Sequence, residues 1–84
     1  MATLIKSNGE ITTVVGANKR VLTLEQLQES VGGYFEFAPT YGTENVIVCE
    51  DGVRRGLPLN NIASKRAGLI LAGDVLFCTD SEIE

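Results

Sequence analysis

The stretch T-L-E-Q-L-Q-E-S-V-G-G-Y-F-E-F, residues 23–37, predicts a helix, a glycine stop and a strand in close succession. Thr23 is a suitable N-cap because its hydroxyl can accept the amide of Gln26, whose own side chain can reach back as in a capping box. Gly32 can end the helix in a left-handed conformation, and Gly33 then allows a sharp change of direction. We therefore expect the helix to fold back over the strand that follows it.

Side-chain periodicity gives both of these elements a buried face. Apolar residues recur at helical spacing at Leu24, Leu27 and Val31. Residues 34–38 read as a strand, in which successive side chains alternate between the two faces. The phenylalanines of this strand, Phe35 and Phe37, are expected to point into the core, with Tyr34 on the more exposed side.

The rest of the chain predicts an α+β fold, a mainly antiparallel sheet of about five strands with one capped helix and one short helix. Asn8-Gly9 is a strong hairpin signal because both residues tolerate positive φ. The other expected elements are strands at residues 2–6, 11–15, 45–49 and 53–57, a turn at 50–52, a short helix within 59–68 capped by Asn60 or Asn61, and a last strand at 69–79 with a turn or bulge at A-G-D. We expect a single domain over residues 1–84, in which residues 80–84 form an acidic, solvated tail.

The composition is that of a small globular protein. Of the 84 residues, 44% are hydrophobic and 21% are charged, and the net charge is −4 without any histidine. A weakly acidic chain is a poor candidate for binding duplex nucleic acid, which favours a basic protein face. No apolar run approaches the ~20 residues of a membrane span, and the first residues lack the apolar core of a signal peptide. We therefore expect a cytoplasmic protein without a duplex-nucleic-acid or membrane partner.

Residues suited to catalysis are scarce in this sequence. Histidine, the commonest general base near neutral pH, is absent, and no Ser-x-x-Lys pairing, phosphate-binding loop or dinucleotide fingerprint occurs. Cys49 and Cys78 each end an apolar run and are expected to be buried small hydrophobes. Two cysteines without histidine are too few for a zinc site. The sequence therefore predicts a protein that is not an enzyme and has no metal or cofactor.

Residue types that bind anions are nevertheless present. Six of the seven basic residues occur as adjacent pairs, Lys19-Arg20, Arg54-Arg55 and Lys65-Arg66. With Asn60 and Tyr34, the last two pairs supply the groups that recognise phosphates and stack on bases. Arg54 and Arg55 would point to opposite faces of one strand, so only one of them can line a given pocket. Each residue also has a structural explanation, since paired basic residues increase solubility and Asn60 can be a helix cap.

Three sequence blocks in this order resemble a family of small uncharacterised proteins that are frequent in bacteriophages and bacteria. The blocks are T-L-E-Q-L-Q-x-x-V-G-G-Y at residues 23–34, L-P-L-N-x-x-A at 57–63 and A-G-D-V-L at 72–76. Members of the family often place another glycine after the final strand, where this chain has Phe77-Cys78. The family is known mainly as a domain of unknown function, so the resemblance names no activity.

The resemblance implies a phage setting, in which small acidic proteins without catalytic residues often act by stoichiometric inhibition. By this analogy we expect the chain to bind and sequester a phosphate-bearing small molecule, above all a cyclic oligonucleotide immune signal. Gly33 would allow close approach of the backbone to the ligand, and Tyr34 would stack on it. The alternative is an inhibitor or regulator that docks on a protein in the host cytoplasm, with an exposed edge strand as one contact.

Self-association is expected as well. One short helix is too small to cover all the apolar residues assigned to the sheet, namely Val46, Val48, Leu57, Leu69, Leu71 and Leu76. Burial of each such side chain stabilises a protein by roughly 1.5–3 kcal/mol. The sequence therefore predicts a homodimer or a higher symmetric oligomer, with Arg54 or Arg55 of two copies in a shared cleft.

Overall fold

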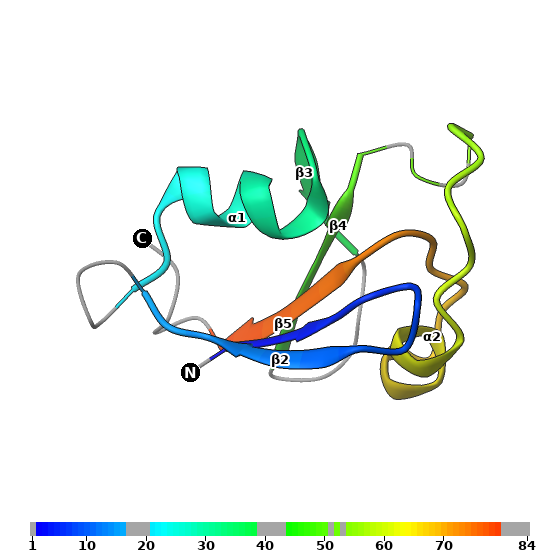
Figure 1. Ribbon diagram of the computed structural model, residues 1–84, viewed down its shortest axis with the longest axis horizontal. Helices are drawn as coiled ribbons and strands as arrows, with labels where there is room; N and C mark the ends of the chain where they lie inside the picture. Colours follow the sequence, from blue (N-terminus) through cyan, green and yellow to red (C-terminus); the bar gives the residue numbers. More distant parts are fainter. Residues whose placement is uncertain (1, 17–20, 39–43, 51, 53, 80–84) are drawn as a thin grey trace.

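The computed structural model describes residues 2–16, 21–38, 44–50, 52 and 54–79. Its elements are β1 (Ala2–Ile5), β2 (Ile11–Val14), α1 (Leu24–Val31), β3 (Phe35–Phe37), β4 (Glu44–Cys49), α2 (Asn61–Ala67) and β5 (Val75–Thr79). The strands form one antiparallel sheet in the order β2-β1-β5-β4-β3 (Figure 1). This arrangement confirms the expected α+β fold. The tail at 80–84 lies outside the described residues.

The predicted capping of α1 is confirmed. The Thr23 hydroxyl accepts the Gln26 N–H at 3.2 Å, and the Gln26 side chain accepts the Thr23 N–H at 3.1 Å. Gly32 ends the helix at φ 80° and ψ 27°, a left-handed conformation that glycine adopts without steric cost. Leu27 and Val31 are buried as predicted, whereas Leu24 in the first turn is 61% exposed.

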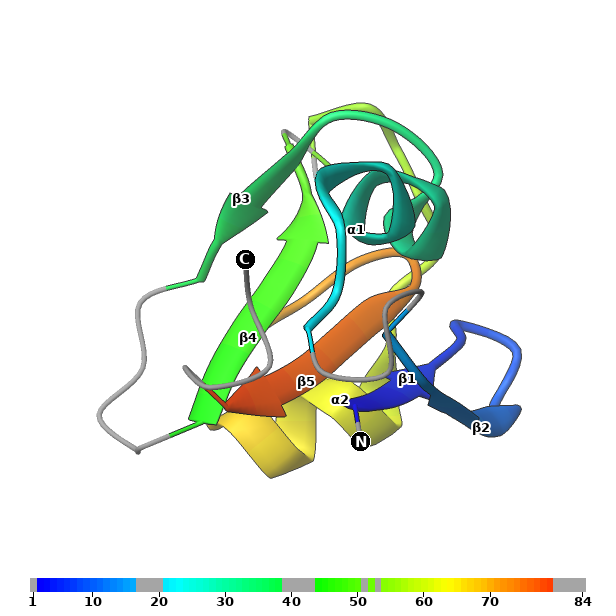
Figure 2. The same ribbon diagram turned by 90° about the vertical axis from the view of Figure 1, so that its left-hand side faces the viewer.

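The two helices cover opposite faces of the sheet (Figure 2). The core on the α1 side contains Ala2, Leu4, Leu22, Leu27, Val31, Ile47, Cys49, Leu76 and Cys78. The core on the α2 side contains Ile5, Val46, Val48, Ala63, Leu71, Val75 and Phe77. Among the described residues, no helix is long and apolar enough to cross a membrane.

The argument from an uncovered sheet face is therefore wrong, although self-association itself stays a prediction. Val46, Val48, Leu71 and Leu76 are all buried within one copy. The chain after α2, which the sequence predicted as the start of the last strand, instead runs over the α2 face as residues 69–72. It makes only an isolated bridge, between Leu59 and Ala72, before β5 begins at Val75. Gly73, at φ 78°, separates the two segments at the predicted A-G-D break.

The strand expected at residues 53–57 is absent from its described part, residues 54–57. Residues 54–56 form a turn instead, and the Leu57 N–H donates to the Gly52 carbonyl at 3.1 Å. The reason is that β4 already pairs with β5 along one edge and with β3 along the other, so no edge of β4 remains for a returning strand. The prediction treated residues 45–57 as an isolated hairpin; Val53 lies outside the described residues.

The prediction for the phenylalanines is half right. Phe35 and Phe37 lie opposite Cys49 and Ile47 of β4 and share the α1 face. Phe35 packs against the core, but Phe37 is 51% exposed. Edge strand β3 lies largely beyond the cover that α1 supplies. Tyr34, expected on the exposed side, is 76% exposed.

Candidate functional site

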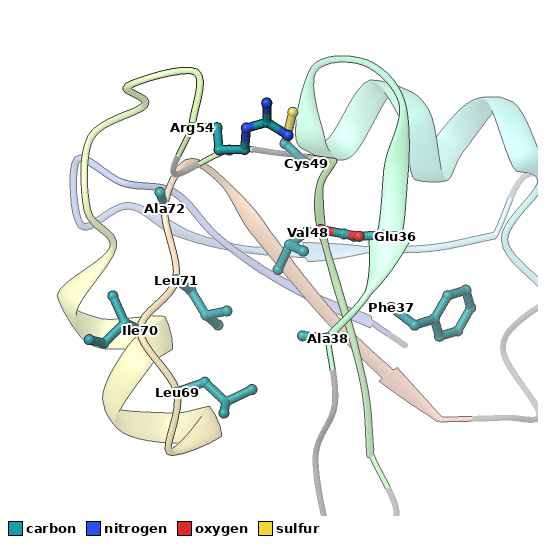
Figure 3. Close-up of a pocket in the computed structure, with 11 residues that line it drawn as sticks. Glu36, Phe37, Ala38, Val48, Cys49, Arg54, Leu69, Ile70, Leu71 and Ala72 are labelled. Atoms are coloured by element: carbon teal, nitrogen blue, oxygen red, sulfur yellow. The ribbon is translucent and has the colours of Figure 1, made fainter.

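An open groove of about 440 Å³ lies on the α2 face of the sheet. It runs between β3 and β4 on one side and residues 69–72 on the other (Figure 3). Apolar side chains line most of it, with Val48 buried between the walls, Ala38 on the β3 side and Leu69, Ile70 and Leu71 on the other. A groove of this size and character can hold a small ligand or a few residues of a peptide.

The main chain of residues 69–72 gives this wall a hydrogen-bonding edge. The Leu71 carbonyl accepts the Asn60 N–H at 2.8 Å, and the Leu71 N–H donates to Ser64 Oγ at 2.9 Å, both toward the α2 side. Because main-chain groups alternate direction along an extended segment, those of Ile70 point away from α2. Within the described residues, no hydrogen bond is formed by the main chain of Ile70. Its side chain is also 79% exposed.

Two charged residues border the groove. Arg54 lies at the end next to Cys49, and Glu36 lies on the β3 wall (Figure 3). Both side chains are exposed. The neighbouring Arg55 is held differently, because its Nη1 donates to Cys49 Sγ at 3.2 Å. Arg54 is thus the cation among the residues that line the groove.

Asn60 does not belong to the candidate ligand site. It is 1% exposed, and its Oδ1 accepts the Ala63 N–H at 3.1 Å as the N-cap of α2. Its Nδ2 donates to the carbonyls of Ile5 and Gly73 at 2.8 and 2.9 Å. Both polar atoms of its side chain are therefore engaged in hydrogen bonds within the fold. This agrees with the alternative in which Asn60 is a helix cap.

The Lys65-Arg66 pair also lies apart from Arg54. Both residues belong to the last turn of α2 and line no part of the groove. Arg66 forms two hydrogen bonds to the Glu44 carboxylate, at 2.7 and 3.3 Å, and its guanidinium carbon lies 4.4 Å from the centre of the Phe77 ring. Arg66 therefore joins α2 to the sheet, and Lys65 remains exposed on the helix.

Gly33 borders a second, shallower depression of about 380 Å³. Its other lining residues are Glu25, Gln28, Glu29 and Gly32. Two carboxylates at this surface disfavour a phosphate. Tyr34 is close to the turn that carries Arg54 and Arg55, since its carbonyl accepts the Glu50 N–H at 2.9 Å. The structure thus brings Tyr34, Arg54 and Arg55 to the same end of β3 and β4, and separates them from the other predicted ligand residues.

The model of the family described as Domain of unknown function (DUF3846) matches residues 1–84. The chain belongs to this family. No curated protein and no solved structure matches it.

Sequence reasoning missed most of the groove of this DUF3846 domain. The apolar run of residues 69–72 carried no local signal that distinguished a groove wall from a buried strand. Glu36 and Ala38 were placed on the sheet without a site assigned to them. The cysteines are as expected: Cys49 and Cys78 are buried, and neither forms a disulfide. In the described ranges, no three His, Cys, Asp or Glu side chains gather as a metal site requires.

Proposed function

We propose that this DUF3846 domain is a non-enzymatic binding protein that takes an extended apolar segment of another protein into the groove between β3 and residues 69–72. The observation that carries the proposal is the main chain of Ile70, which has no partner among the described residues and lies between Leu69 and Leu71, whose apolar side chains point into the groove (Figure 3). An extended peptide uses both features, because its backbone pairs with an exposed edge while alternate side chains enter pockets.

The chemistry of the bound segment follows from the groove lining. Val48, Leu69 and Leu71 favour aliphatic side chains at alternate positions of the bound strand. Arg54 at one end favours an acidic residue there, because a guanidinium binds a carboxylate through paired hydrogen bonds. A nucleobase is less well served, since Phe37, an aromatic residue of the lining, points its ring away from the groove (Figure 3).

The setting of this proposal comes from the resemblance to phage and bacterial proteins. In that setting the partner is a host protein, and occupation of the groove inhibits or regulates it in the host cytoplasm. The domain supplies binding alone in this mechanism, with no group in a catalytic role.

Selection of random peptides displayed on phage tests the proposal. We expect enriched peptides to alternate aliphatic residues with others and to carry an acidic residue at one end. Leu69→Asp should weaken their binding by tenfold or more, about 1.4 kcal/mol, because the side chain of Leu69 points into the groove (Figure 3) and a charge there opposes aliphatic side chains. Leu24→Asp is the matched control, as Leu24 is exposed on α1 away from the groove.

Methylation of alternate backbone nitrogens in a selected peptide tests main-chain pairing separately. Methylation of one alternating set of nitrogens, those that pair with the domain, should abolish binding. Methylation of the other set should leave binding unchanged. The proposal fails if no peptide is enriched, or if Leu69→Asp and Leu24→Asp bind the peptides equally.

A second candidate is sequestration of a phosphate-bearing small molecule, such as a cyclic oligonucleotide. The observation in its favour is the placement of two exposed arginines, Arg54 and Arg55, in one turn near the exposed Tyr34. Calorimetry against cyclic dinucleotides and trinucleotides, followed by recovery of the ligand after heating the protein, decides the matter. Heat that disappears in Arg54→Ala, with intact ligand recovered, supports sequestration; no heat, or hydrolysed ligand, removes it.

A further inference from the structure

The two edge strands of the sheet differ in how they are protected from pairing with another strand. Natural edge strands avoid such pairing by shortness, charge, proline or bulges. β3 has three residues with Glu36 at its centre. β2 is Ile-Thr-Thr-Val at residues 11–14, followed by Val15, without any charge, proline or glycine. β2, with four residues, is nearly as short as β3 but lacks its central charge.

The outer edge of β2 presents both main-chain groups and apolar side chains. The Lys6 N–H donates to the Glu10 carbonyl at 2.8 Å, which fixes the phase of the β1–β2 ladder. By alternation, the main-chain groups of Ile11 and Thr13 point to the free edge. Within the described residues no strand pairs with that edge, and at its end the Val15 carbonyl accepts a hydrogen bond from Gln26 Nε2 at 2.9 Å. Ile11 and Val15 are also 57% and 54% exposed.

We infer that β2 is the surface through which two copies of this chain associate, with the strands antiparallel about a two-fold axis at Thr13. This register places Thr13 beside Thr13 of the second copy, and Ile11 beside Val15 of the second copy. On the other face, Thr12 meets Val14 of the second copy. Every pair is apolar or threonine, so the strand is complementary to itself.

Charge favours a second copy as the occupant of this edge. Each chain has a net charge of −4, so two copies repel wherever acidic surfaces meet. The uncharged β2 edge allows them to meet without juxtaposed carboxylates. Ile62 of α2 adds to the apolar surface at the hairpin turn. It is 43% exposed, and its Cδ1 would lie 3.9 Å from a methyl group at Gly9.

The dimer would form one continuous sheet, with β3 of each copy at its ends. The grooves lie at those ends, so both remain open, and the two Arg54 side chains are far apart. This assembly therefore provides no shared cleft for Arg54 or Arg55 of the kind expected from the sequence. The inference does not depend on what the groove binds.

Light scattering of the purified protein from micromolar to millimolar concentration tests the inference. The wild type should reach twice the monomer mass, whereas Thr13→Lys should keep the monomer mass, because it places two lysines side by side at the axis. Phe37→Lys is the control, since it places the same charge on an exposed residue of the other edge strand. A monomeric wild type, a dimeric Thr13→Lys or a monomeric Phe37→Lys overturns the inference.

Amide hydrogen exchange of the wild type provides a test that needs no variant. The N–H groups of Ile11 and Thr13 should exchange more slowly as protein concentration rises, because pairing with the second copy protects them. Those of Phe35 and Phe37, on the outer edge of β3, should not change. If rising concentration slowed amide exchange at β3 and not at β2, the contact between copies would lie at β3, and the inference would be rejected.

Discussion

At Asn60, a single buried amide joins three parts of the chain. Its side-chain oxygen caps α2. Its side-chain amide donates to the carbonyl of Ile5, at the end of β1, and to the carbonyl of Gly73, two residues before β5. These bonds position residues 58–60 and the start of α2 on the sheet. The residue that the sequence offered as a ligand contact therefore determines where one wall of the groove begins.

Asn60→Ala should lower the free energy of unfolding by about 3 kcal/mol, because it removes the cap and leaves two buried carbonyls without donors. Asn60→Asp is the sharper variant: it keeps the capping oxygen but loses both donors, so most of the loss should remain. Urea unfolding measures both effects. Asn61→Ala, at an exposed neighbour, should change stability by less than about 0.5 kcal/mol. An Asn60→Asp variant as stable as the wild type would show that the two donated bonds contribute nothing.

At the scale of elements, α2 is attached to the sheet at both of its ends. Asn60 fixes its N-terminus, and Arg66 in its last turn binds Glu44 at the start of β4 and lies over Phe77 of β5. Phe77 is 1% exposed, so the guanidinium forms part of the cover of this ring. The ion pair itself is partly solvated, with 41% and 39% of the two side chains exposed.

Arg66→Ala should therefore destabilise the protein by about 1 kcal/mol, mostly through the exposure of Phe77. The coupling between Arg66 and Glu44 in a double-mutant cycle should be below about 1 kcal/mol and should fall further in high salt. Thermal unfolding of Arg66→Ala, Glu44→Ala and the double variant measures these values. If the loss in Arg66→Ala vanished entirely in high salt, the ion pair rather than the cover of Phe77 would be the main contribution.

At the scale of the whole molecule, one copy buries apolar residues on both faces of its sheet. Association through an edge adds a contact without completing the core. The fold and the proposed dimer should thus be separable, in contrast to the expectation that a single copy would leave several leucines and valines in water.

A monomeric variant should consequently remain folded. The thermal midpoint of the wild type should rise with protein concentration, because association stabilises the native state by mass action. The midpoint of Thr13→Lys should be independent of concentration while its unfolding stays cooperative. Calorimetry at several concentrations measures both. An unfolded Thr13→Lys, with Phe37→Lys folded, would mean that the dimer is needed for folding.

The sequence alone determined the features whose interactions lie within a few residues. The Thr23–Gln26 capping box, the left-handed Gly32, the turn at Gly9 with φ 94° and the Asn60 cap, as one of two alternatives, were all predictable for this reason. The alternation of side chains along a strand also predicted that Phe35 and Phe37 share one face of the sheet, because this alternation depends only on strand geometry.

Only the tertiary structure decided what depends on distant neighbours. Residues 54–57 form no strand because β3 and β5 already flank β4, and the local sequence of the expected hairpin carries no information about those neighbours. Residues 69–72 leave the sheet and cover its α2 face because Asn60 and Ser64 bind the main chain of Leu71. The groove is built from three segments that are far apart along the chain. Its shape therefore depends on how they pack together, and no local pattern in any one of them specifies it.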